Sequence, residues 1–409
     1  MTSPRNLEEL PRADIVRWLA DDEAKRWFVK VSELAQPELA IPKLRRELSV
    51  EKAAAIVAQH LLRIRAAAKF SRAEHMLFTR VGLEQASDEA IANYKAKRFA
   101  QPRPIADLCC GVGGDLIGLA ANRDVLAVDR SDVATSLALH NTAVYQRQAH
   151  VKTASVDSGV TADLSAWHLD PDRRATGKRT IRIDDYSPAP TTLLAGSVNA
   201  AIKLAPATVV PPQWESVAEL EWVETRGECR QQIAWFGDLA ERPGRRRAVS
   251  LDESGARLSE VCGEVTEFMP LAVEIGQYVH EPHASVRAAR LVDTLASQTG
   301  LLRVSASAPY LTGDLPEIPS ARSYQVVDVL PMREKTVGKY LKAHRIGRVE
   351  VKKRGVDCQP AALQKAWKND GSDSATILIC RRQDHRLAAI VSKPVHARRM
   401  ALQRAHQRR

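Results

Sequence analysis

Pro104-Ile-Ala-Asp-Leu-Cys-Cys-Gly-Val-Gly-Gly-Asp115, followed by Val125-Leu-Ala-Val-Asp129, is the part of the sequence that decides the fold. The first run predicts a short buried parallel strand, and its glycines let the backbone turn tightly into a helix that starts near Asp115. Gly111 and Gly113 therefore allow a ligand to approach the main chain. About 20 residues after this turn, Asp129 ends a second apolar strand, where its carboxylate is expected to face a ribose diol. These features predict an α/β, Rossmann-like fold with a nucleotide-cofactor pocket.

The acidic residue before the glycines separates two classes of cofactor. Asp107 stands at the end of the first strand, where its charge would repel the pyrophosphate of a dinucleotide. The same charge would attract the cationic amino and sulfonium groups of S-adenosylmethionine. We therefore expect S-adenosylmethionine as the cofactor, with NAD as the alternative. The predicted cofactor-binding residues from these motifs are Asp107, Gly111, Gly113 and Asp129.

Two further predicted strands extend this pocket. Residues 151–157 read as a strand that ends in Asp157, which is expected to hold the adenine amino group by hydrogen bonding. Residues 162–169 read as a fourth strand, which leads directly into Asp170-Pro171. Reacting groups of open α/β sheets lie at the carboxyl ends of strands, so Asp170 and Pro171 are the predicted catalytic residues. Asp170 would accept a hydrogen bond from the attacking group and Pro171 would fix the loop; a helix N-cap is the alternative role for Asp170.

The glycine motif resembles motif I of class I methyltransferases. Asp107 to Gly114 is most similar to the version found in trimethylguanosine synthase and related RNA methyltransferases. The segment from Leu77-Phe-Thr79 through Gln85 also resembles the region that precedes motif I in those enzymes. This resemblance implies that Thr79 and Gln85 reach the carboxylate of the methyl donor, although surface turn positions are the simpler interpretation.

The whole chain is more similar still to bacterial class I methyltransferases with a THUMP-like C-terminal domain. The Asp-Pro-x-Arg-Arg motif of those proteins is matched here by Asp170, Pro171, Arg173 and Arg174. The resemblance to this family implies a methyltransferase; taken with the likeness to RNA methyltransferases, we expect it to act on RNA, with a purine exocyclic nitrogen as the acceptor. Enzymes of that kind usually carry an aromatic residue where Arg173 stands. A guanidinium can stack on a base or bind phosphate through two hydrogen bonds, so Arg173 and Arg174 are expected to contact RNA.

Other functions stay open at this point. The loop also resembles that of uracil-C5 methyltransferases, which need a nucleophilic cysteine, and Cys229 is the loosely placed candidate. A methyltransferase of a small-molecule acceptor is another alternative. A non-catalytic RNA-binding protein that retains a donor pocket is the third.

Positive charge is concentrated in the last part of the chain. Residues 322–409 contain 21 basic and 7 acidic residues, a net charge of +14, whereas the whole chain carries +11. The same region alternates predicted strands and helices, which indicates a compact α+β unit that resembles the THUMP-like module. Lys352, Lys353 and Arg354 end one of its strands and are expected to meet an RNA backbone.

The 409 residues are expected to form several parts. These are a helical cap over residues 1–103, a methyltransferase core over 104–250, a sheet elaboration and connector over 251–321, a basic THUMP-like α+β domain over 322–395, and a basic tail over 396–409. The six cysteines form no C-x-x-C pair, so no metal site is expected. No apolar stretch long enough for a membrane span stands out, and we expect a cytoplasmic protein. The sequence makes no prediction of the oligomeric state.

Overall fold

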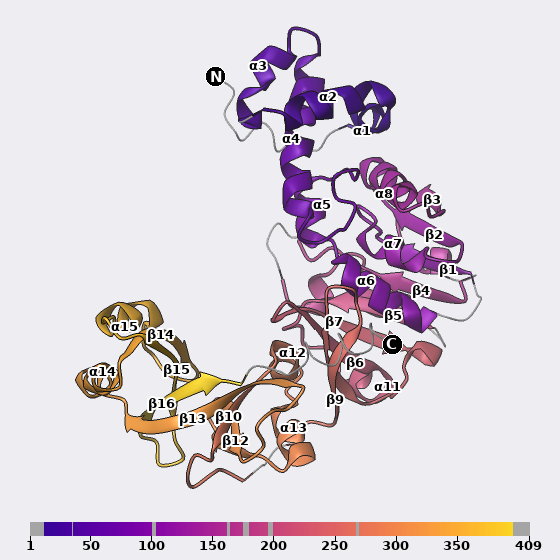
Figure 1. The fold of residues 1–409 in the computed structure, drawn as a ribbon. Coiled ribbons are helices and arrows are strands. Elements are labelled where there is room, and N and C mark those ends of the chain that lie inside the picture. Colours follow the sequence, from indigo (N-terminus) through magenta and orange to yellow (C-terminus); the bar gives the residue numbers. More distant parts are fainter. Residues whose placement is uncertain are drawn as a thin grey trace, which may run out of the picture. The chain divides into compact units, whose positions relative to one another are not determined.

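The computed structural model of the chain describes residues 12–34, 36–99, 104–161, 164–174, 180–194, 199–266 and 270–395. The chain divides into two compact units (Figure 1). The first unit holds the chain up to Arg226 together with Arg230–Gly244 and Leu251–Arg257. The second holds Gly227–Cys229, Arg245–Ser250 and the chain from Leu258 onward. The predicted tail over 396–409 lies outside the described residues.

Helices form the N-terminal part of the first unit, as the three-to-four spacing of apolar residues predicts. Ser49 caps the longest of them by accepting a hydrogen bond from the backbone N–H of Lys52, and Ile56 and Val57 of that helix are buried. The core cluster that these helices form also includes Val112 of the glycine turn. The elements are α1 (Ala13–Ala20), α2 (Asp22–Ser32), η2 (Pro37–Leu39), α3 (Ile41–Leu44), α4 (Val50–Ala66), α5 (Arg80–Gln85), α6 (Glu89–Ala96) and η3 (Lys97–Phe99).

A mostly parallel sheet follows, in the order β3-β2-β1-β4-β5-β7-β6. Its strands are β1 (Ile105–Leu108), β2 (Val125–Asp129), β3 (His150–Thr153), β4 (Ala166–Leu169), β5 (Ala200–Leu204), β6 (Glu219–Thr225) and β7 (Glu228–Phe236). The first five are parallel to one another, and β7 pairs antiparallel with β5. Chain order reverses between β1 and β4, so ligands are expected at the carboxyl ends of these two strands.

Short helices connect the strands of this sheet. They are α7 (Gly114–Leu119), α8 (Asp132–Val144), α9 (Ser158–Thr161), η4 (Ile183–Asp185), α10 (Pro190–Leu193), α11 (Pro212–Val217) and η5 (Gly237–Leu239). Gly113 caps α7 with φ of +83°, and a Cβ there would lie 3.2 Å from the Cα of Ala138 in α8. Gly118 has a different role, because a Cβ on it would overlap the backbone oxygen of Ala92 in α6. Glycine therefore serves both the turn and the close packing of α6 on α7.

The second unit contains a seven-stranded sheet in the order β11-β12-β10-β13-β16-β15-β14. The elements are β8 (Arg246–Leu251), β9 (Arg257–Gly263), β10 (Tyr278–Pro282), α12 (Ala284–Ala288), α13 (Val292–Thr299), β11 (Leu302–Ser305), β12 (Ala308–Gly313), β13 (Ala321–Pro331), α14 (Glu334–Ala343), β14 (Ile346–Lys353), α15 (Pro360–Ala366), β15 (Asp373–Arg381) and β16 (Leu387–Pro394). β16 lies between β13 and β15, and β14 is parallel to β15. The predicted α+β character of this region is confirmed. β10 and β12, within the predicted connector over 251–321, belong to the same sheet.

Candidate functional site

The glycine turn and the end of β2 meet at one edge of the sheet. The Asp129 carboxylate accepts hydrogen bonds from the backbone N–H of Gly111 and of Ser131, each at 3.0 Å. A Cβ built on Gly111 meets nothing within 4 Å, so the space above the turn is open to a ligand. The structure thus brings together Gly111, Gly113 and Asp129, three of the predicted cofactor residues. An open main-chain turn beside a carboxylate fits an adenosine cofactor whose ribose hydroxyls need an acceptor.

Asp107 is buried in β1, the strand that leads into the glycine turn. It is 1% exposed, and its neighbour on β4 in the sheet register is His168. His168 Nδ1 lies 2.8 Å from Asp107 Oδ1, and Asp107 Oδ2 has no hydrogen bond within the described part of the chain. Burial raises the pKa of Asp107. In the structure this carboxylate contacts a buried histidine, and its predicted role in binding the cofactor stays a prediction.

His168 belongs to a buried network of charged side chains that also includes Lys95 and Asp115. Lys95 Nζ lies 2.5 Å from Asp115 Oδ1 and 3.1 Å from His168 Nε2. Lys95 is 1% exposed and Asp115 is 6% exposed. Burial alone would raise the pKa of Asp115, but Lys95, His168 and Lys203 together hold it below its ordinary value. Burial lowers the pKa of Lys95. The ionised Asp115 therefore compensates the cations around it.

The predicted catalytic carboxylate ends the same network. Asp170 follows β4, and Lys203 lies on the neighbouring strand β5, where Leu169 pairs with Ile202. Lys203 Nζ donates to Asp170 Oδ2 at 2.6 Å and to the backbone oxygen of Gln85 at 2.9 Å. Burial opposes the charge of Lys203, yet Asp170 and Asp115 raise its pKa overall. The Asp170 side chain is 27% exposed, so this carboxylate is fixed and still accessible.

Three other predicted site residues occupy less specific positions. Asp157 is exposed beyond the end of β3, where its carboxylate accepts hydrogen bonds from the backbone N–H of Gly159 and Val160. Thr79 caps α5, since its hydroxyl oxygen accepts from the backbone N–H of Gly82 at 2.9 Å. Gln85 ends that helix. The roles of Asp157, Thr79 and Gln85 in cofactor binding stay predictions.

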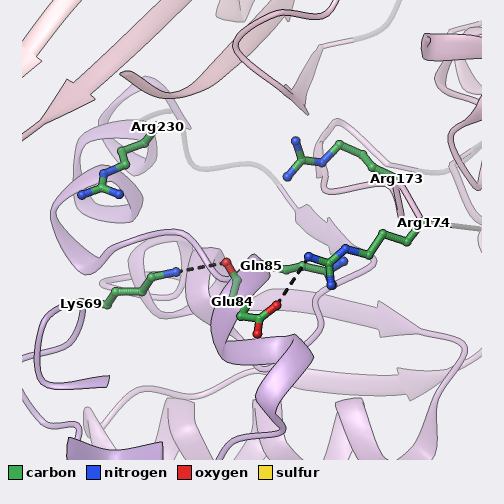
Figure 2. A pocket seen from close by; sticks show the side chains of 6 residues that line it. All are labelled: Lys69, Glu84, Gln85, Arg173, Arg174 and Arg230. Atoms are coloured by element: carbon green, nitrogen blue, oxygen red, sulfur yellow. Dashed lines mark hydrogen bonds and ion pairs between the residues drawn. The ribbon is translucent and has the colours of Figure 1, made fainter. Parts of the chain in front are cut away.

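A cavity of about 350 Å³, which we call the basic cavity, lies beside Gln85. Its lining residues are Lys69, Glu84, Gln85, Arg173, Arg174 and Arg230. Figure 2 shows Arg173 and Arg174 reaching it from one side, and Lys69 and Arg230 from the other. The sequence predicted the two arginines of the loop after β4. It missed Lys69 and Arg230, which come from the loop after α4 and from strand β7.

The predicted RNA contacts of the second unit are engaged in internal interactions. Lys352 Nζ lies 3.0 Å from Glu281 Oε2, and Arg354 pairs with the other oxygen of Glu281. Burial would raise the pKa of Glu281, but Lys352 and Arg354 hold it below its ordinary value. Lys353 Nζ donates to the backbone oxygen of Cys358 at 2.7 Å. These contacts stabilise the domain and leave the three cations less available to a phosphate backbone than the sequence suggested.

The strand order, the glycine turn and the acidic end of β2 define a class I methyltransferase fold. Two proteins of Mycobacterium tuberculosis, from strains CDC 1551 / Oshkosh and H37Rv, are each 30% identical to the chain over 348 residues. The match covers 81% of this chain and 93% of each relative, and both are named uncharacterized S-adenosylmethionine-dependent methyltransferases. The chain belongs to this family of S-adenosylmethionine-dependent methyltransferases. The predicted enzyme class and cofactor are thereby confirmed.

Two further comparisons cover the fold and the second unit. Residues 321–394 match the THUMP domain-like family, close to the predicted range of 322–395. A crystal structure from Porphyromonas gingivalis W83, of a protein provisionally named a methyltransferase, is 19% identical and has a TM-score of 0.74. That similarity covers 97% of this chain and all of the other, and it supports the fold.

The described residues contain neither a cluster of metal ligands nor a membrane-spanning helix. Among them, no group of three or more histidine, cysteine, aspartate or glutamate side chains is arranged to hold a metal ion. No helix within the same residues has the length and apolar character needed to span a bilayer.

Proposed function

We propose that the protein transfers a methyl group to RNA, at an exocyclic nitrogen of a purine. The observation that carries this proposal is Asp170, a fixed and accessible carboxylate at the carboxyl end of β4, beside a cavity lined by four cations. The carboxylate can accept a hydrogen bond from the N–H of an amine, and the cations can bind a molecule that carries phosphate. The cofactor would be held by Gly111, Gly113 and Asp129. Asp107 would contribute indirectly, because its contact with His168 joins strand β1 to strand β4.

Asp170 has the hydrogen-bonding capacity that this reaction needs. Its Oδ2 is occupied by Lys203, and its Oδ1 makes no hydrogen bond within the described residues. Oδ1 would accept a hydrogen bond from an exocyclic N–H and direct the nitrogen toward the donor. Bound S-adenosylmethionine supplies an electrophilic methyl group, and alignment for in-line displacement is worth roughly 7–11 kcal/mol at best. When the nitrogen takes up the methyl group it would lose one proton, which Asp170 would accept and pass on to water.

Lys203 would act as a positioning residue in this scheme. It holds Asp170 through one oxygen and is itself held by the carbonyl of Gln85. Because its pKa is raised, Lys203 stays charged at neutral pH and keeps the carboxylate oriented. Pro171 is buried and restricts the loop that carries Asp170.

Helix α14 supplies a surface on which the second unit would bind RNA. Lys335, Lys339 and Lys342 are exposed and lie at three-to-four spacing, so they share one face of the helix. None of the three has a hydrogen-bond or ion-pair partner within the described residues. Val337 and Leu341 point into the core from the other side. This face supports RNA binding better than Lys352, Lys353 and Arg354, whose roles in RNA contact stay predictions.

The catalytic proposal is tested by incubating the protein with labelled S-adenosylmethionine and total cellular RNA, followed by mass spectrometry of the nucleosides. Wild type should produce a purine methylated on its exocyclic nitrogen. Asp170→Asn should bind S-adenosylhomocysteine in calorimetry but form no such product. Methylation of uracil C5, or transfer to small molecules without transfer to RNA, would contradict the proposal.

Binding through α14 is tested by measuring RNA affinity at several salt concentrations. Replacing Lys335, Lys339 and Lys342 by glutamine should reduce the slope of log K against log salt by about 2–3, since each phosphate contact contributes roughly 0.7–0.9. The matched control replaces Lys43, Arg45 and Arg46, three exposed cations of the first unit, by glutamine. An equal change of slope in both triple variants would rule out a specific role for α14.

A further inference from the structure

We propose that the basic cavity is a subsite for one phosphate group of the methyl-accepting substrate, an inference that rests on the proposed function. The acceptor would then be recognised as a nucleotide rather than as a bare base or nucleoside. Four cationic side chains and one carboxylate line a space of about 350 Å³ within the first unit (Figure 2). Small-ligand sites have volumes of roughly 300–1,000 Å³, so the cavity holds a phosphate and part of its nucleotide.

Lys69 provides a fixed positive charge at this place. Its ammonium donates to the backbone oxygens of Leu83, Glu84 and Ala86 at 2.9, 3.3 and 2.8 Å, around the end of α5. All three N–H donors of the ammonium are therefore satisfied, and its charge acts on a ligand at short range without direct contact. Burial lowers the pKa of Lys69; Asp88 and Glu84 oppose this shift, while the cations Lys203 and Arg230 add to it. With four cations and one carboxylate in the lining, the cavity carries an excess of positive charge, which favours an anionic ligand.

The arginines of the loop after β4 are the groups that would contact the phosphate. The guanidinium of Arg173 has no hydrogen-bond or ion-pair partner among the residues that the structure describes. Arg174 makes a long contact with Glu84, 3.5 Å between Nη2 and Oε2. A planar guanidinium donates two parallel hydrogen bonds to phosphate oxygens, and a phosphate would compete well for Arg174 against so long a contact. Glu84 then opposes anion binding, because its own charge is negative.

The basic cavity is linked to Asp170, the proposed catalytic carboxylate, through Gln85 and Lys203. Gln85 lines the cavity, and its backbone oxygen accepts from Lys203, which holds Asp170. Arg173 follows Asp170 by three residues in the same loop. The loop that carries the reacting carboxylate thus supplies two of the lining residues, Arg173 and Arg174, whereas the glycine turn after β1 supplies none. This placement favours a phosphate of the acceptor over the carboxylate of the methyl donor.

The test uses inorganic phosphate as the probe, with binding to the full-length protein followed by ³¹P NMR line broadening. Arg173→Gln should weaken binding about tenfold, as expected for loss of a charge-assisted contact. Glu84→Gln should strengthen binding several-fold, because it removes the one negative charge of the lining. Arg45→Gln is the matched control, since Arg45 is exposed and has no partner within the described residues. Arg173→Gln and Arg45→Gln remove no internal contact and are expected to fold.

The outcomes separate this subsite from other ligands and from the proposed function. Weaker phosphate binding in Arg173→Gln with unchanged affinity for S-adenosylhomocysteine supports the inference. Equal losses for both ligands would identify the cavity with the donor carboxylate and overturn it. Unchanged phosphate binding in Arg173→Gln and Glu84→Gln also overturns it, even if RNA is methylated normally. If phosphate binds as expected but RNA is not methylated, the proposed RNA acceptor fails and the anion subsite remains.

Discussion

Removal of the charge of Asp115 should destabilise the first unit strongly. Asp115 is 6% exposed and compensates Lys95 at 2.5 Å, with Lys203 at 3.9 Å and His168 at 3.7 Å from its other oxygen. Asp115→Asn keeps the size of the side chain but leaves Lys95 as a buried cation without a carboxylate partner. Breaking a buried ion pair in this way costs about 3–5 kcal/mol of unfolding free energy.

Differential scanning calorimetry would measure this loss. A change of 1 kcal/mol moves the transition temperature of a unit of this size by about 2–4 °C, so the transition should fall by roughly 6–20 °C. Asp124→Asn is the matched control, because Asp124 is exposed and has no partner within the described residues. A fall of less than about 2 °C in Asp115→Asn would refute the claim that Lys95 depends on Asp115 as its buried charge partner.

The pH dependence of the same variant gives an independent check. The folded protein lowers the pKa of Asp115, so the stabilisation is complete above the unfolded value of about 4 and is lost as the pH falls through the folded value. The difference between wild type and Asp115→Asn should therefore be constant near neutral pH and shrink in acid. Adding Lys95→Met to Asp115→Asn should recover part of the loss, because it removes the uncompensated cation.

Three further predictions concern the loops and the second unit. Lys203→Met should lower kcat about 100-fold with little change in the affinity for S-adenosylhomocysteine. Lys203→Arg should recover part of the rate, because a guanidinium still holds Asp170. Equal rates for the two variants would exclude positioning by charge. Gly113→Val should abolish S-adenosylhomocysteine binding in calorimetry, whereas Gly227→Val, also at positive φ (+78°) but in open space, should not. Glu281→Gln should lower the stability of the second unit by about 1.5–3 kcal/mol, the range for hydrogen bonds to charged groups, because Lys352 and Arg354 lose a buried partner but are themselves partly exposed. An unchanged thermal transition would contradict this.

Local patterns predicted much of the fold. The strand, glycine turn and helix around Gly111 and the strand that ends in Asp129 are contiguous in sequence, and each has its own signal in residue type and periodicity. The elements of the C-terminal α+β unit were predicted for the same reason. The order of strands in its sheet was not, because the insertion of β16 between β13 and β15 depends on pairing rather than on local pattern.

Long-range pairing also limits what sequence could say about the site. Lys95 and His168 are 73 residues apart, and Lys203 and Asp170 are 33 apart, yet each pair is within hydrogen-bond distance. The available signal was a charged or polar residue inside an otherwise apolar strand, as with His168 in β4 and Lys203 in β5. Such a residue predicts a buried partner, because an unpaired charge is too costly to bury, but it does not identify that partner. The partner of Lys352 was equally hidden from the sequence, since Glu281 lies 71 residues earlier.

The buried network connects the two halves of the proposed site through side chains alone. Asp107 lies on the strand that carries the glycine turn, and Asp170 lies on the loop that would face the acceptor. Between them, His168, Lys95, Asp115 and Lys203 form a chain of contacts of 3.9 Å or less. An apolar core could pack these strands equally well, so stability alone does not explain six ionisable groups there. In the proposed mechanism, these buried groups would set the orientation of Asp170 relative to the turn, an alignment on which methyl transfer would depend.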